Sequence, residues 1–196
     1  MVVVIKYAKR AEARYMSHND TMRALQRTVR RMGIRAEMST GFNVHMLTYS
    51  SPPLPLGLLS EAEYFAVKVQ QNAQEKARQA DDFEALYNAH CHPNLPLAKL
   101  WILPQNPNLA AKVTSSEYKY VEGGAGGLDC GDKGGKTGGI NSSNSEGAIS
   151  SVITSKKPKE ICADYYNLVR CAQFVGEVNV DDFLTQNVTR GVKFEG

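Results

Sequence analysis

The amino-acid sequence predicts an α+β protein, in which strands and helices alternate through the first half of the chain. Two observations lead to this prediction. The run VVVIKY at residues 2–7 is rich in β-branched residues and ends on an aromatic one, which is typical of a strand. Residues 18–32 carry apolar side chains at helical spacing, which is typical of an amphipathic helix that packs on a sheet.

The predicted helix has a defined beginning and end. Ser17 is expected to cap its N-terminus, with Asp20 in a position like that of a capping box. Its apolar stripe is expected to face the sheet and consists of Met22, Leu25, Val29 and Met32. Gly33 is expected to end the helix. Residues 13–16, just before the cap, could extend the first strand or form its hairpin partner.

Further strands are predicted at residues 34–38, 46–49, 64–69 and 97–103. A second helix is predicted after Asp81 or Asp82, with Phe83, Leu86 and Tyr87 on one face. The resulting order is β-α-β-β-α-β, with room for one additional strand before the third. This order is typical of the ferredoxin-like split βαβ fold, a four-stranded antiparallel sheet covered on one face by two helices.

After residue 107 the patterns weaken, and a smaller, interrupted C-terminal α/β lobe is expected. Strands are predicted at 116–121, 149–154 and 166–175, and a short helix near 181–188. Residues 122–151 are mostly Gly, Ser, Asn and Lys, which bury too little apolar surface to offset the entropy of ordering, so a flexible loop is expected. The predicted domains are a ferredoxin-like domain at 1–107, a strand and connection at 108–121, the Gly-rich loop at 122–151, and the rest of the lobe at 152–196.

Charge is distributed unevenly along the chain. The net charge is only +3, but the first 35 residues contain just two acids, Glu12 and Asp20, against a group of basic residues. That group is Lys6, Lys9, Arg10, Arg14, Arg23, Arg27, Arg30, Arg31 and Arg35. No apolar run approaches the roughly 20 residues that span a bilayer, so no membrane association is expected. The cysteines show no CxxC spacing, and we expect reduced thiols in a cytoplasmic protein.

Several short strings between residues 17 and 64 occur in an unusual combination. The residues that carry it are Ser17, His18, Asp20, Arg23, Ala24, Leu25, Arg30, Arg31, Gly33, Gly41, Phe42, Asn43, His45, Pro53, Leu54, Pro55, Leu56, Gly57, Ser60, Glu61, Ala62, Glu63 and Tyr64. They resemble the radical S-adenosylmethionine (SAM)-associated domain of unknown function 2344. Residues 156–161 and 178–184 resemble a later strand and helix of that family. The resemblance implies a radical SAM protein, fused or encoded nearby, as a partner, and it implies no established reaction.

The cysteine spacing limits the chemistry of this chain. A radical SAM enzyme holds its iron–sulfur cluster on a CxxxCxxC run, which the sequence lacks, so any radical chemistry would belong to another chain. His90, Cys91 and His92 are possible metal ligands, but three consecutive side chains point in different directions and cannot close on one ion. We therefore predict no metal and no cofactor.

A candidate ligand site combines the start of the helix with the loop at residues 41–45. Its members are Ser17, His18, Asp20, Gly41, Phe42, Asn43 and His45. In a split βαβ fold these two segments can lie at the same end of the sheet, where the free N–H groups of a helix attract anions and where Lys9 or Arg14 would add positive charge. The alternative is that Ser17 and Asp20 only cap the helix and that Asn43 only turns the chain.

Arg23, Arg27, Arg30 and Arg31 lie along one side of the predicted helix, and we call them the arginine face. This face is either a solvated surface or a site of RNA contact through phosphates. The leading interpretation is a noncatalytic accessory module that binds RNA, or an RNA-modifying radical SAM enzyme, through this face and the 41–45 loop. The alternative is a small RNA-processing enzyme with His18 and His45 as acid and base, which requires both histidines in one cleft.

Overall fold

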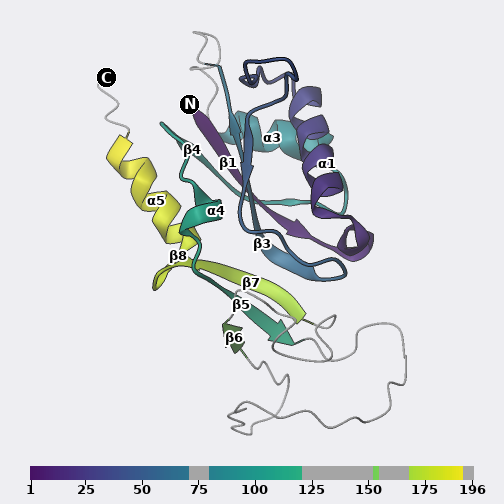
Figure 1. Ribbon diagram of the computed structural model, residues 1–196, viewed down its shortest axis with the longest axis vertical. Coiled ribbons are helices and arrows are strands. Elements are labelled where there is room, and N and C mark those ends of the chain that lie inside the picture. Colours follow the sequence, from purple (N-terminus) through teal and green to yellow (C-terminus); the bar gives the residue numbers. More distant parts are fainter. Residues whose placement is uncertain (71–79, 121–151, 155–167, 192–196) are drawn as a thin grey trace, which may run out of the picture.

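The protein is described by a computed structural model, in which residues 1–70, 80–120, 152–154 and 168–191 are placed (Figure 1). Eight strands from these residues form a single mixed sheet in the order β4-β1-β3-β7-β5-β6, with β2 paired to β3 and β8 paired to β7. Helices cover the sheet, so the predicted α+β class is confirmed.

The strands are β1 (Val2–Lys9), β2 (Thr48–Ser50), β3 (Leu59–Lys68), β4 (Leu97–Leu103), β5 (Ser115–Tyr120), β6 (Val152–Thr154), β7 (Leu168–Val175) and β8 (Val178–Asn179). The helices are η1 (Ala11–Tyr15), α1 (His18–Arg31), α3 (Ala80–His90), α4 (Leu109–Lys112) and α5 (Val180–Gly191). The strands predicted at 97–103, 116–121 and 166–175 and the helix predicted near 181–188 are confirmed within one to three residues at each end.

Strand β1 occupies the middle of the N-terminal part of the sheet. It pairs antiparallel with β3 on one side and with β4 on the other, so that Val4 lies between Ala66 and Trp101. Strand β3 then pairs antiparallel with β2 near its end and parallel with β7 at Leu59 and Ser60. Because β7 and β5 continue the same sheet, the sheet runs across the predicted boundary at residue 107.

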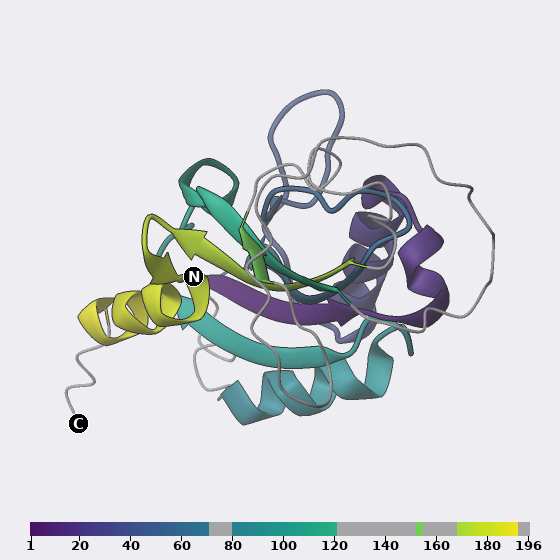
Figure 2. The ribbon, with the colours of Figure 1, turned by 90° about the horizontal axis from the view of Figure 1, so that it is seen from below.

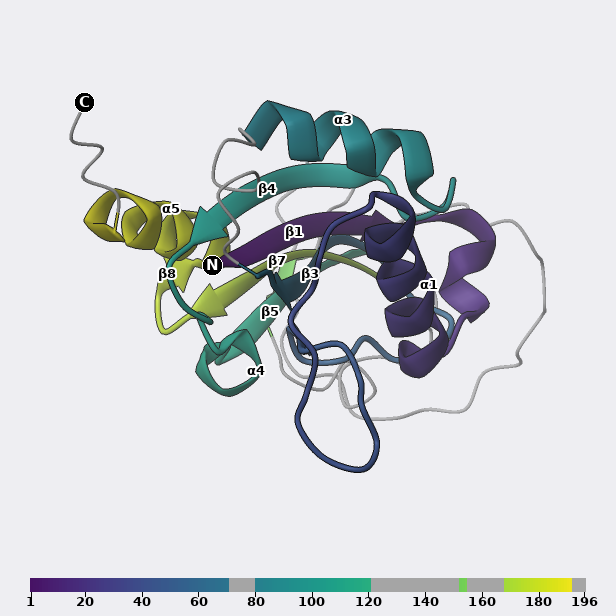
Figure 3. The same cartoon turned by 90° about the horizontal axis from the view of Figure 1, so that it is seen from above.

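Both faces of the sheet are buried, and this explains the continuous apolar run of β1. Val3 and Ile5 point to the face covered by α1 and α3, where they join the core around Leu25. Val2 and Val4 point to the other face, which α4 and α5 cover, and join a second core. Figure 2 and Figure 3 show α3 and α5 lying on different sides of the strands. The two helices of the N-terminal part, α1 and α3, thus share one face, and the C-terminal helices α4 and α5 cover the second face, which the expected four-stranded sheet left open.

Three expectations about single segments also need correction. Residues 11–15 form the short helix η1 rather than a strand, because Ala11 takes a left-handed conformation (φ 45°) at which the extended chain cannot continue. Residues 34–38 form no regular strand and contribute isolated bridges from Ala36 to Val69 and from Met38 to Met46. Strand β3 begins at Leu59 and not at Tyr64. The predicted flexible loop at 122–151 lies outside the described residues.

Candidate nucleic-acid interface

Helix α1 carries the arginine face, and local contacts determine the residues at which this helix begins and ends. The Ser17 hydroxyl accepts a hydrogen bond from the backbone N–H of Asp20 (3.1 Å) and donates one to the Asp20 carboxylate (2.7 Å). These bonds satisfy free groups of the first turn, so the predicted N-cap is confirmed. At the other end Gly33 has φ +68°, the left-handed conformation that glycine adopts most readily after a helix.

The apolar stripe holds α1 against the sheet and turns the arginine face outward. Leu25, Val29 and Met32 are buried, and Met22 packs partly buried against the same core. The arginine face is exposed along its whole length. Arg23 lies 3.4 Å from Asp20, a weak exposed pair, whereas no acid of the described residues lies within ion-pair distance of Arg27, Arg30 or Arg31. Three positive charges of this face are therefore left to interact with solvent or with a partner.

The chain runs from the last turn of α1 into a loop at residues 39–45, which protrudes from the body of the protein (Figure 3). The loop is closed by its own hydrogen bonds. The Ser39 N–H donates to the His45 carbonyl (2.7 Å), and the His45 N–H donates to the Ser39 hydroxyl (3.0 Å). Next to this closure, Met38 bridges to Met46. The loop is thus shaped by local contacts even though residues 40–45 are exposed.

The His45 ring is part of this closure. Its Nδ1 atom lies 3.0 Å from the Asn43 carbonyl and 2.9 Å from the Ser39 hydroxyl. A carbonyl only accepts hydrogen bonds, so the contact with Asn43 requires a proton on Nδ1. In the neutral ring Nε2 is then an acceptor. The His45 ring and the backbone carbonyl of Asn43 therefore both take part in closing the loop.

The candidate ligand residues fall into two groups that the fold keeps apart. His18 follows the end of β1, where Lys9 pairs with Ser60 at the start of β3. The 39–45 loop follows Glu37, whose N–H donates to the carbonyl of Lys68 at the end of β3. Ser60 and Lys68 are separated by roughly 26 Å along an extended strand.

His18 lies near Lys9, as expected, and also near Glu63, which was not expected. Its pKa is lowered, chiefly by burial and further by the charge of Lys9, against the opposing effect of Glu63. The Lys9 ammonium is itself buried and donates to the Met16 carbonyl (2.8 Å). Arg14 donates from Nε to the Gly57 carbonyl (2.7 Å). Lys9 and Arg14, which we considered as phosphate contacts, are both engaged with the backbone.

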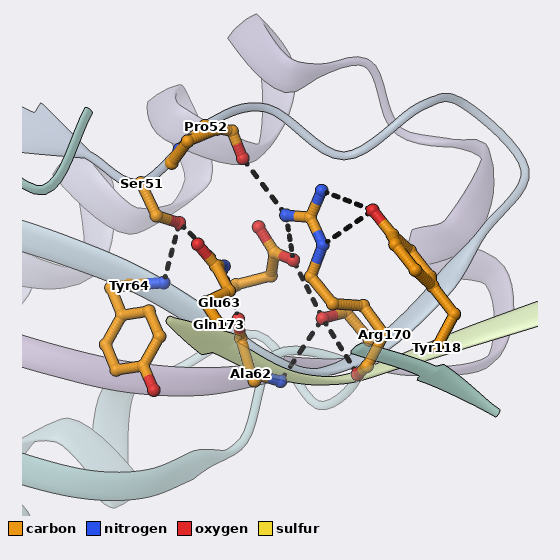
Figure 4. A network of polar contacts seen from close by, with 9 residues as sticks. Ser51, Pro52, Ala62, Glu63, Tyr64, Tyr118, Arg170 and Gln173 are labelled. Carbon is orange, nitrogen blue, oxygen red and sulfur yellow. Dashed lines mark hydrogen bonds and ion pairs between the residues drawn. The ribbon is translucent and has the colours of Figure 1, made fainter. Parts of the chain in front are cut away.

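Glu63 and Arg170 are the centre of a buried polar cluster that joins distant parts of the chain (Figure 4). Arg170 forms an ion pair with Glu63 (3.0 Å) and donates to the Pro52 carbonyl (3.0 Å) and to the Tyr118 hydroxyl (3.0 and 3.2 Å). Nearby, Gln173 donates to the carbonyl of Ala62 (2.6 Å). The cluster ties β3, β5, β7 and the proline-rich segment together.

Our reading of the sequence missed Arg170 and Gln173. A usable signal lies in the pattern of β3, where Glu63 interrupts the otherwise apolar run AEYFAV. A carboxylate in a strand that is buried on both faces needs a cationic or hydrogen-bonding partner. The strand LVRCAQFV, which carries an arginine at an inward position, offers such a partner. The sequence does not say which of several lysines and arginines takes that place.

Comparison with known proteins places the chain in a family. Residues 3–168 match the family described as "Uncharacterized protein conserved in bacteria (DUF2344)". The chain belongs to DUF2344. The DUF2344 match spans α1, the 39–45 loop, the proline-rich segment and β3, and so includes both groups of candidate residues. The search of curated proteins found no match. The description of DUF2344 names no reaction and no partner, so the association with radical SAM proteins stays a prediction.

Two searches of the structure concern other kinds of site. Within the residues that the structure describes, no group of three or more His, Cys, Asp and Glu side chains is arranged to hold a metal ion. In the same part of the chain, no helix has the length and apolar character needed to cross a membrane. Cys91 and Cys171, the two described cysteines, are free thiols.

Proposed function

We propose that this DUF2344 protein is a noncatalytic accessory module that binds RNA. Its binding surface would consist of the arginine face of α1 and the 39–45 loop, which we call the candidate RNA surface. The observation that carries the proposal is that Arg27, Arg30 and Arg31 are exposed and that, among the described residues, no acid lies within ion-pair distance of them. Arginine binds phosphate with high geometric specificity, and a stripe of unpaired arginines follows a nucleic-acid backbone well.

The noncatalytic part of the proposal rests on where the histidines lie. A general acid and a general base must both reach the reacting atoms, within about 3 Å of their protons or through one water. His18 lies near the start of β3, and His45 lies in the loop beside its end. This separation favours binding over cleavage, and we do not put forward the acid–base alternative.

Two finer assignments belong to the same proposal. The strand order β4-β1-β3-β2 with α1 and α3 on one face supports a ferredoxin-like core, to which β5, β7 and α5 would be an addition. The resemblance of residues 17–64 to the radical SAM-associated family supports a radical SAM protein as a partner in the cytoplasm. Coexpression of the two proteins and copurification through a tag on one of them tests the partnership.

The RNA proposal is tested by titrating a labelled RNA at several salt concentrations. Each neutralised phosphate releases condensed counterions, so the association constant for a single strand falls with salt, with a slope of roughly −0.7 per contact in a plot of log association constant against log salt concentration. The variant R27A/R30A should bind all sequences more weakly and should lose about 1.4 of that slope. R10A is the control for loss of an exposed positive charge outside α1, because Arg10 is exposed and pairs with Glu61. Absence of RNA binding by the wild-type protein at low salt would remove the proposal.

A further inference from the structure

The 39–45 loop exposes an unusual amount of apolar surface for its length. The Phe42 side chain is completely exposed, Val44 is 58% exposed, and Met38 at the base of the loop is 40% exposed. Single exposed apolar residues are common on protein surfaces. Three within one short protruding segment are a contiguous group, and such groups mark sites of interaction.

The loop holds this group in a fixed shape. Two backbone N–H groups and the His45 ring bond across its base, through Ser39 and Asn43. Gly41, just before Phe42, has φ +128°, a conformation that side chains rarely allow. Hydrogen bonds that close the loop in the free protein reduce the entropy that is lost when Phe42 meets a partner, and this lowers the cost of binding.

The positive charge of α1, the helix that precedes the loop, indicates the kind of partner. Arg30 and Arg31 lie in the last turn of α1, immediately before the segment that leads to the loop, and neither has an acidic partner among the described residues. An exposed aromatic side chain together with a separate face of unpaired arginines matches a single strand that reaches both, because cations follow the phosphates while the ring stacks on an unpaired base. A duplex offers phosphates but keeps its bases stacked on each other.

We propose that Phe42 stacks on an unpaired base of single-stranded RNA while the arginine face binds the adjoining phosphates. This inference rests on the proposed function and adds the class of RNA. The module prefers an unpaired strand to a duplex of equal length. Base–aromatic stacking tolerates any sequence because every base has a flat face, so the preference concerns strandedness and not sequence.

The test compares a labelled, unstructured 12-nucleotide RNA with its duplex, by fluorescence anisotropy at fixed salt. F42A should lose roughly 5-fold to 150-fold in affinity for the single strand, the range measured for base–aromatic stacks. Its affinity for the duplex should hardly change, and its salt slope should equal that of the wild type. F42Y should retain binding, since tyrosine stacks as well. L56A is the control, because Leu56 is another exposed apolar residue (56%) and lies in the proline-rich segment near η1.

The outcomes separate the inference from the function it rests on. Equal affinity of F42A and the wild type for the single strand would overturn the stacking role while RNA binding through the arginine face stands. Tighter binding of the wild type to the duplex would overturn it as well. Preferential binding to vesicles of anionic phospholipid, lost in F42A, would assign the loop to a membrane surface instead. No binding of either RNA would remove the proposed function itself.

Discussion

Arg170 and Glu63 are separated by 107 residues in the chain, yet their side chains form a buried ion pair with an N–O distance of 3.0 Å. The guanidinium is 2% exposed and the carboxylate 6%. Both groups have further hydrogen bonds: Arg170 donates to Tyr118 and Pro52, and Ser60 donates to Glu63 (2.7 Å). Such complete pairing is what a buried ion pair needs to offset the cost of leaving water.

Replacement of Arg170 by methionine should therefore destabilise the protein strongly. The variant R170M leaves the Glu63 carboxylate buried without a counter-charge, which costs about 3–5 kcal/mol in comparable sites. Urea unfolding followed by circular dichroism measures the loss. R10A is the control, since the Arg10–Glu61 pair is exposed and is expected to contribute about 0–1 kcal/mol.

The double variant E63L/R170M tests the explanation. Removing both charges avoids the unpaired carboxylate, and apolar replacements of buried pairs are often neutral, so most of the stability should return. A double variant as unstable as R170M would mean that the contacts with Tyr118 and Pro52 matter more than the charge of Glu63.

Leu25 should be one of the most sensitive positions of α1. It is 1% exposed and packs between the helix and the sheet. L25A should cost about 2–5 kcal/mol, because it removes buried methyl groups and leaves a cavity. R27A, two positions along the same helix, should change the unfolding free energy by no more than about 0.5 kcal/mol. The same pair of unfolding curves also establishes that R27A is folded in the RNA titrations.

Stability should fall at alkaline pH because of three buried tyrosines. Burial is the largest cause that raises the pKa of Tyr7, Tyr64 and Tyr87 in the folded protein. In the unfolded chain these hydroxyls ionise near pH 10, so above that pH the unfolded state loses protons that the folded state keeps. The stabilisation is complete below pH 10 and is lost as pH rises further. Burial lowers the pKa of Lys9, and this single group acts in the opposite sense.

Above pH 10, each of these tyrosines makes the free energy of unfolding fall by roughly 1.4 kcal/mol per pH unit. Unfolding in urea at pH 8, 10 and 11 measures it. Y87F should make the fall of the unfolding free energy with pH shallower by the contribution of one tyrosine. At neutral pH the variant should be slightly less stable than the wild type, because it lacks the hydrogen bond from Tyr87 to the Leu95 carbonyl. An unfolding free energy that stays constant between pH 10 and 11 would contradict this explanation.

The sequence was informative where one local pattern decides the structure. The N-cap at Ser17, the stripe around Leu25 and the end of the helix at Gly33 all depend on neighbouring residues, and all are confirmed. It was uninformative where distant segments meet. Nothing near Arg170 shows that Glu63 will face it, and nothing near Leu59 shows that β7 will pair in parallel there.

The same distinction applies to the candidate site. The exposed arginine face follows from helical spacing and is therefore predictable. The relation between His18 and His45 is not, because it depends on which end of β3 receives the 39–45 loop. The backbone hydrogen bonds of Glu37 and Leu47 with Lys68 place the loop at the C-terminal end of β3. The residues around these three positions show no pattern that predicts this pairing.

The backbone of Gly41 gives the last prediction, which tests whether the shape of the 39–45 loop matters for binding. A Cβ at Gly41 would meet no atom within 4 Å, so G41A introduces no clash and acts only through its φ of +128°. A side chain in such a conformation costs about 1–3 kcal/mol, and an exposed loop avoids the cost by changing shape.

Gly176 offers a matched control, because it has φ +62°, also has no neighbour within 4 Å, and lies in the turn between β7 and β8. We expect G41A to weaken binding of single-stranded RNA with an unchanged salt slope, and G176A to bind like the wild type. Equal RNA affinities of the two variants in the same anisotropy titration would show that the loop needs no fixed shape.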